Sequence, residues 1–290
     1  MTTARIETRI DKSPTGVLEM TALTHMRRLI HDIRLFAAAL AFLLVLAPHC
    51  APAHAEPHFS TVVIVSADAE WKEVKRLYPK ARYLPQAYGE FFVLAPGTVV
   101  MHGGWGKISA AASAQYAIDR WTPDSIVNLG TCGGIAGRID RYAVVAVTKT
   151  IVYDIVEQMG DPDEAIGFYT TAIDLSWAGT PLPGSPIATV LLSADRDLVA
   201  GDINALVAKY DVRAVDWESG AIAWTARRNG KRVLILRGVS DLVSVQGGGE
   251  AYGNTGVFED GTQRVMKTLF DILPAWLARL SENPRSLRQP

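Results

Sequence analysis

The chain has 290 residues, and its 29 lysines and arginines nearly balance 30 aspartates and glutamates, which gives a formal net charge of −1. Apolar residues make up 49% and charged residues 20%, values typical of a folded globular domain. This composition excludes a disordered chain, a collagen-like repeat and a small domain held together by disulfides. It also argues against a nucleic-acid-binding protein that relies on bulk positive charge.

The first 55 residues have the organisation of a secretory signal peptide with an upstream extension. A basic stretch covers 26–34, thirteen apolar residues without a charge follow at 35–47, and Ala53-His54-Ala55 places small residues where a signal peptidase requires them. The apolar run falls well short of the roughly 20 residues that a membrane-spanning helix needs. We therefore expect cleavage after Ala55, no stable membrane insertion, and a secreted or periplasmic protein.

Removal of residues 1–55 leaves one domain of 235 residues, 56–290. The removed part holds six basic and four acidic residues, so the net charge of the domain is −3. Cys132 is the only cysteine of this domain, which excludes an internal disulfide and argues against a structural zinc site.

Strand patterns and helix patterns alternate along the domain in chain order. Buried or paired strands are predicted at 61–66, 91–94, 98–101, 125–129, 143–147, 151–152, 188–192 and 232–236. Helices are predicted just after 67–70 and at 107–121, 218–229 and 258–280, with glycine turns at 103–106 and 130–134 and a glycine-rich loop at 246–256. This alternation, without any linker that divides it, predicts a single α/β domain.

Carboxylates and glycine turns collect where several predicted strands end. Glu70 follows the first strand, Asp241 follows the last, and Glu218 stands at a predicted helix start. In open α/β sheets, ligands bind at the carboxyl ends of the strands. Each feature also has a simpler interpretation as a turn, a helix cap or a surface charge. Their conjunction favours a binding or catalytic site.

These segments resemble the nucleoside phosphorylase and nucleosidase superfamily, and are most similar to the 5′-methylthioadenosine/S-adenosylhomocysteine nucleosidases. The resemblance covers about residues 61–281 and rests on five motifs in the family's order. They are Ala69-Glu70 after the first strand, Gly104-Trp105-Gly106-Lys107, the run 127–134 (VNLGTCGG), the run 215–223 (VDWESGAIA) and the run 237–241 (RGVSD). The resemblance implies a single-domain, three-layer α/β/α fold with a central mixed sheet.

The resemblance also implies a role for each site residue. Asp241, oriented by Ser240, would be the acid that protonates the departing purine near N7, and Glu70 would be the base that activates water. Glu218 would hold the ribose hydroxyls. The other residues implied to contact the substrate are Trp217, Trp105, Thr131, Gly133, Leu198 and Phe258. A small nucleoside as partner, a homodimer, and no metal or organic cofactor are expected on the same basis.

Hydrolysis of the N-glycosidic bond of purine nucleosides such as 5′-methylthioadenosine or S-adenosylhomocysteine is the function that the resemblance implies. The alternatives are a phosphate-dependent phosphorylase and a nucleoside-binding or storage protein. The superfamily's phosphorylases carry a G-D-P-x-R loop and an arginine before the second glycine turn, where this chain has Ser66-Ala67-Asp68 and Asn128. Without those cations a phosphate dianion would lack charge-assisted partners, so we favour water as the nucleophile.

Two departures from the family's pattern bear on the substrate. The family has an aromatic residue that stacks on the purine where this chain offers Asp197 or Leu198. Trp105 replaces a smaller aliphatic residue near the ribose and the 5′ substituent. The resemblance therefore leaves the preferred base and 5′ group open.

Overall fold

The computed structural model describes residues 26–31, 33–36 and 58–283. The chain divides into a unit of residues 1–55 and a unit of residues 56–290, which are taken separately. In the first unit, the described residues are helical and exposed. Most of the apolar segment and the expected cleavage site after Ala55 lie outside the described residues. Among the described helices, none is both long and apolar enough to cross a membrane.

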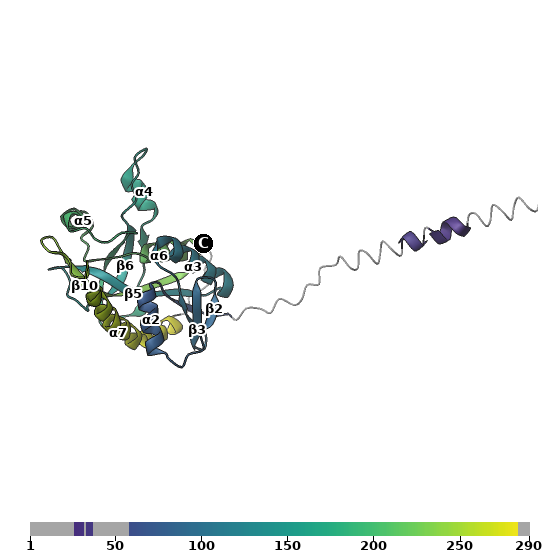
Figure 1. The fold of residues 1–290 in the computed structure, drawn as a ribbon, viewed down its shortest axis with the longest axis horizontal. Helices are drawn as coiled ribbons and strands as arrows, with labels where there is room; N and C mark the ends of the chain where they lie inside the picture. The colour runs from purple at the N-terminus through teal and green to yellow at the C-terminus, as the bar shows by residue number, and fades with distance from the viewer. Residues whose placement is uncertain (1–25, 32, 37–57, 284–290) are drawn as a thin grey trace, which may run out of the picture. The chain divides into compact units, whose positions relative to one another are not determined.

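The second unit is built on a mixed sheet with helices on both faces (Figure 1). Its strands follow the order β11-β10-β6-β8-β9-β5-β1-β4-β3-β2, and β7 pairs with β6 at the side. Their bounds are β1 (Thr61–Val65), β2 (Leu84–Gln86), β3 (Gly89–Ala95), β4 (Thr98–His102), β5 (Ser125–Ile135), β6 (Val144–Val152), β7 (Thr171–Ala172), β8 (Ile187–Ser193), β9 (Ala214–Asp216), β10 (Arg232–Ser244) and β11 (Gly248–Gly249).

Five strands of the sheet form a closed ring. β5 pairs with β9 on one side and also with β10, and β10, β6, β8 and β9 pair in succession. The β5–β10 pairing is parallel and runs from Arg232 opposite Ser125 to Val243 opposite Ile135. β5 and β10 are parallel, so their carboxyl ends lie at one edge, as the carboxyl ends of the parallel pair β8 and β9 do at theirs. The antiparallel pairing of β9 with β5 places Val215 opposite Gly133, and this brings the end of β9 against the second half of β5.

Helices cover the two faces of this sheet through separate apolar cores. The helical elements are α2 (Asp68–Leu77), α3 (Gly106–Trp121), α4 (Pro162–Phe168), α5 (Ile203–Tyr210), α6 (Ser219–Arg228) and α7 (Thr255–Glu282), with 3₁₀ turns η1 (Ser176–Ala178) and η2 (Ala200–Asp202). α3 and α6 pack on one face through Ala114, Trp121 and Ile222, and α2 and α7 pack on the other through Trp71 and Trp276 (Figure 1). The predicted three-layer α/β/α class is therefore confirmed.

The predicted elements are present, but several boundaries were wrong. The glycines at 130–134 do not form a turn: β5 continues through them to Ile135, and β10 likewise continues through 237–241 to Ser244. The segments 143–147 and 151–152 are one strand, β6. Part of the 246–256 loop forms β11 and the start of α7. Pairing with distant strands extends these segments, and that pairing is not visible in local sequence patterns.

Candidate active site

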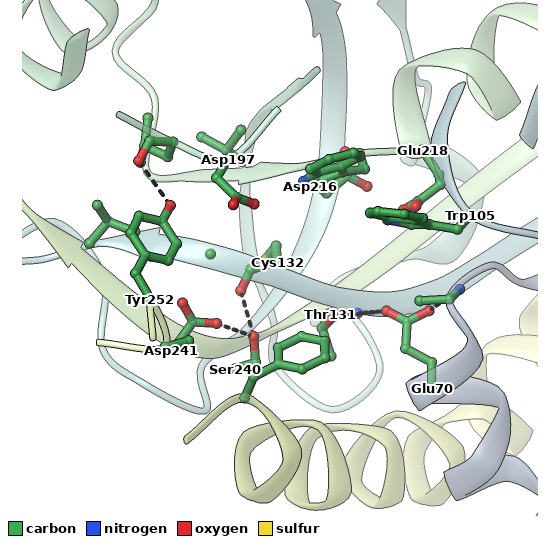
Figure 2. A pocket seen from close by; sticks show the side chains of 18 of the residues that line it. Glu70, Trp105, Thr131, Cys132, Asp197, Asp216, Glu218, Ser240, Asp241 and Tyr252 are labelled. Carbon is green, nitrogen blue, oxygen red and sulfur yellow. Dashed lines mark hydrogen bonds between the residues drawn. The ribbon is translucent and has the colours of Figure 1, made fainter. Parts of the chain in front are cut away.

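A cavity of about 470 Å³ is lined by residues from the second half of β5, from β9 and from the second half of β10 (Figure 2). All ten site residues predicted from the sequence line it, namely Glu70, Trp105, Thr131, Gly133, Leu198, Trp217, Glu218, Ser240, Asp241 and Phe258. Ten further residues line it, and of these the sequence pointed only to Asp197, as the alternative to Leu198; they are Ala67, Asp68, Cys132, Asp197, Val215, Asp216, Val243, Ala251, Tyr252 and Thr255. The lining thus contains six carboxyl groups, and none of these described lining residues is a lysine, arginine or histidine.

Glu70 is fixed at the start of α2, where its side chain is almost completely buried. Its Oε2 accepts a hydrogen bond from the backbone N–H of Ala67 at 3.2 Å, as a glutamate in a first helical turn commonly does. Its Oε1 accepts from both donors of Thr131, the backbone N–H at 2.6 Å and the hydroxyl at 2.8 Å. The Thr131 donors on the cavity wall are therefore occupied by a carboxylate of the protein itself.

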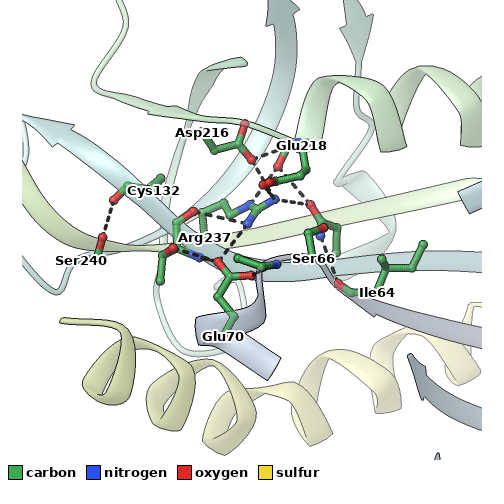
Figure 3. A network of polar contacts seen from close by, with 12 residues as sticks. Ile64, Ser66, Glu70, Cys132, Asp216, Glu218, Arg237 and Ser240 are labelled. Carbon is green, nitrogen blue, oxygen red and sulfur yellow. Dashed lines mark hydrogen bonds and ion pairs between the residues drawn. The ribbon is translucent and has the colours of Figure 1, made fainter. Parts of the chain in front are cut away.

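Arg237 of β10 lies beneath the cavity, fully buried, and connects three of its acids (Figure 3). Its guanidinium nitrogens lie 2.8 Å from Asp216 Oδ2, 3.6 Å from Glu218 Oε2 and 3.6 Å from Glu70 Oε1. A buried charge requires such partners, since an unpaired one is strongly destabilising. In the sequence, Arg237 directly follows the apolar run 233–236, which was the signal for this network, but no role was predicted for it.

Neutral groups take up the other donors of Arg237. Its Nε donates to Ser219 Oγ at 2.9 Å and its Nη2 to Asn128 Oδ1 at 2.8 Å. Asn128 thus faces the buried guanidinium.

The same network explains why residue 130 of β5 is a glycine. A Cβ at Gly130 would lie 1.9 Å from Arg237 Nη1 and 2.6 Å from Glu70 Oε1. The glycine is needed for this close approach and not for a turn.

Glu218 precedes α6 and faces the cavity from beside β9. Its Oε1 accepts from the backbone N–H of Gly106 at 3.1 Å, and Gly106 has the positive φ of +81° that glycine tolerates. Burial raises the pKa of Glu218 to about 8, with further upward contributions from Asp216 and Glu70 and an opposing one from Arg237. One guanidinium does not compensate three carboxylates, so Glu218 retains a proton near neutral pH.

Asp241 lies inside β10 at a β-bulge. Val239 pairs with Cys132 and Asp241 with Gly133, so Ser240 is the extra residue that changes the register. The Ser240 hydroxyl is 2.6 Å from Asp241 Oδ1. Burial raises the pKa of Asp241 above its usual value, against the lowering effect of the Ser240 hydrogen bond and of the Arg141 charge. The bulge thus presents a carboxyl group with an increased tendency to hold a proton.

Aromatic residues form the remaining walls. The indoles of Trp105 and Trp217 stack with ring centroids 4.8 Å apart and planes at 26°, and Trp105 is 64% exposed at the mouth. From the loop before α7, the Tyr252 hydroxyl donates to the Leu198 carbonyl at 2.9 Å. Within the described part of the chain, no group of three or more histidine, cysteine, aspartate or glutamate side chains is arranged to hold a metal ion.

Comparison with known proteins places the chain in a family. A 5′-methylthioadenosine/S-adenosylhomocysteine nucleosidase of Listeria welshimeri is 26% identical over 204 residues, covering 63% of this chain and 87% of the relative. A mutant of the Helicobacter pylori enzyme of that name, solved with 5′-methylthioadenosine in its active site, superimposes with a TM-score of 0.60 at 14% identity, covering 74% and 98% of the two chains. Futalosine hydrolase of the same organism gives 0.60 at 16% identity, covering 74% and 97%. The resemblance seen in the sequence is confirmed: the phosphorylase superfamily model matches residues 61–278, and the chain belongs to this superfamily.

Proposed function

We propose that this chain is a nucleosidase that hydrolyses the N-glycosidic bond of purine nucleosides and releases the free base and a ribose derivative. The observation that carries the proposal is the charge of the cavity, in which six carboxyl groups and no cationic side chain line the described wall. A phosphate dianion would meet this acidic wall and would have to displace Glu70 from both Thr131 donors. Water has no such requirement.

The three acids predicted from the sequence are suited to the chemistry of this hydrolysis. A departing purine is a poor leaving group unless it is protonated, and Asp241 has the raised pKa of a general acid. Glu70 would accept a proton from the attacking water on the opposite side of an oxocarbenium-like sugar. Glu218, which shares with Glu70 the contact to Arg237, would hold the ribose hydroxyls. Trp105 and Trp217 would form the wall beside the sugar.

The test is a panel of purine nucleosides incubated with the purified domain without phosphate and read by chromatography. The panel includes 5′-methylthioadenosine and S-adenosylhomocysteine, because the names of the relatives point to them. Free base and a free ribose derivative are expected. Turnover only with added phosphate, with ribose 1-phosphate as product, would make the chain a phosphorylase. Tight binding without turnover would make it a binding protein.

We also propose that the protein is exported and that the mature domain is a homodimer. The charged stretch, apolar run and Ala53-His54-Ala55 of the sequence support export, and the dimer rests on similarity to the family. Terminal sequencing of the protein recovered from its host is expected to begin at Glu56. Light scattering of the purified domain is expected to give twice the mass of one chain, and a monomer mass would contradict the dimer.

A further inference from the structure

The end of the cavity farthest from Glu70 holds two carboxyl groups, Asp197 and Asp241 (Figure 2). The two side chains extend toward the cavity from opposite sides, Asp241 from β10 and Asp197 from the loop after β8. Tyr252 lies near both, and their charges act on its hydroxyl. With Glu70 and Glu218 at the sugar end, this end is left for the base. The inference developed from it rests on the proposed function.

The Asp197 carboxylate is an unused acceptor at this end. Within the described part of the chain it has no hydrogen bond or ion pair, while its neighbour Arg196 is paired with Asp202 at 2.8 Å. The Leu198 carbonyl, the next acceptor along the loop, already accepts a hydrogen bond from the Tyr252 hydroxyl. Burial raises the pKa of Tyr252 to about 12, so that hydroxyl keeps its proton and its bond. Asp197 therefore offers a base a free acceptor across the cavity from Asp241.

Purines differ in what they present on the edge opposite N7. With N7 against Asp241, the edge toward Asp197 is the one that carries position 2. Guanine has an amino donor there, next to its N1–H, whereas adenine has a C–H group and ring-nitrogen acceptors. The only amino group of adenine lies beside N7, on the Asp241 side. A carboxylate at the far edge is therefore matched by guanine and opposed by adenine.

We infer that Asp197 determines the base specificity of this site by accepting hydrogen bonds from the 2-amino group and N1–H of a guanine-type base. Nucleosides of 2-aminopurines are therefore preferred over matching nucleosides that lack the amino group. Where the family's nucleosidases carry an aromatic residue that stacks on the face of the base, this chain offers Asp197 or Leu198, and Asp197 supplies a contact to the edge of the base. Asp197 is exposed, and water screening reduces the preference to about tenfold.

The experiment compares substrate pairs that differ only in the 2-amino group, guanosine with inosine and 2,6-diaminopurine riboside with adenosine. In the unaltered chain, kcat/KM is expected to be about tenfold higher for the amino member of each pair. In Asp197→Asn both ratios fall toward one, mainly through guanosine and 2,6-diaminopurine riboside. Asp202→Asn is the control, because it removes a carboxylate charge a few residues away, outside the cavity lining.

The results distinguish a failure of the role of Asp197 from a failure of the proposed nucleosidase function. Release of base from every nucleoside at equal rates within the pairs, or ratios that survive in Asp197→Asn, would overturn the role of Asp197 and leave the nucleosidase proposal standing. Absence of base release from every nucleoside would instead defeat the proposed function. Unchanged thermal unfolding of Asp197→Asn shows that any loss of preference is not a loss of fold.

Discussion

Asp241 is the residue on which the proposed hydrolysis depends most directly. Asp241→Asn keeps the shape and the Ser240 contact but removes the transferable proton, so kcat is expected to fall by roughly 10²–10⁴. In the unaltered chain, activity should decline as pH rises through the raised pKa of Asp241, because only the protonated form is an acid. Rates of base release from a purine nucleoside measure both the loss of kcat in Asp241→Asn and the decline of activity with pH in the unaltered chain. The exposed Asp260→Asn on α7 is the control, and near-normal turnover of Asp241→Asn would remove Asp241 from the acid role.

Glu218 links protonation to stability. Its pKa in the folded chain is about 8, above the ordinary 4.5, so its proton stabilises the fold fully below 4.5 and this stabilisation is lost as pH rises through 8. Glu218→Gln has no such proton. Between pH 5 and pH 9, the Tm of the unaltered chain should fall relative to the Tm of Glu218→Gln. The expected fall is about 2–4 °C for each kcal/mol of unfolding free energy that is lost. Parallel Tm curves for the two proteins would contradict a proton on Glu218.

At the scale of elements, the contact of α7 with β10 positions the acid. A Cβ at Gly261 of α7 would lie 2.2 Å from the Ser240 carbonyl oxygen, at the bulge. Gly261→Ala should therefore push the helix or the strand, cost about 1–3 kcal/mol of unfolding free energy, and lower kcat by displacing Asp241. Gly256→Ala is the matched control, since a Cβ there has only Asn254 Oδ1 nearby, at 3.5 Å. Denaturant unfolding measures the loss of stability, and kcat measures the displacement of Asp241. Equal stability and equal kcat in Gly261→Ala and Gly256→Ala would argue against a role of the α7–β10 contact in positioning Asp241.

The elements themselves were predictable where periodicity was strong, as in β1, the β3–β4 hairpin and α3. The glycine run of β5 was read as a turn because glycine is common in turns. The glycine at position 130 is required by contacts with residues distant in the sequence, because the side chains of Arg237 from β10 and Glu70 from α2 occupy the space that a Cβ would fill. Local patterns contain no information about that approach.

At the scale of the whole molecule, the ring of β5, β10, β6, β8 and β9 gathers the site from segments far apart in the chain. Eight of the ten predicted site residues were predictable because five motifs contain them, and only Leu198 and Phe258 lie outside these motifs. The contacts around them were not predictable, since the Arg237–Asp216 ion pair forms through strand pairing and Tyr252 reaches the cavity from the loop before α7. The chemical roles of the site residues remain predictions for the variants above.

The burial of Arg237 affects how strongly the site depends on the salt concentration of its surroundings. Dissolved ions weaken interactions between exposed charges but reach a fully buried guanidinium and its acids much less. The electrostatic support of the site is therefore insulated from ionic strength. For a protein exported as we propose, this insulation would keep turnover steady in surroundings whose salt content the cell does not control.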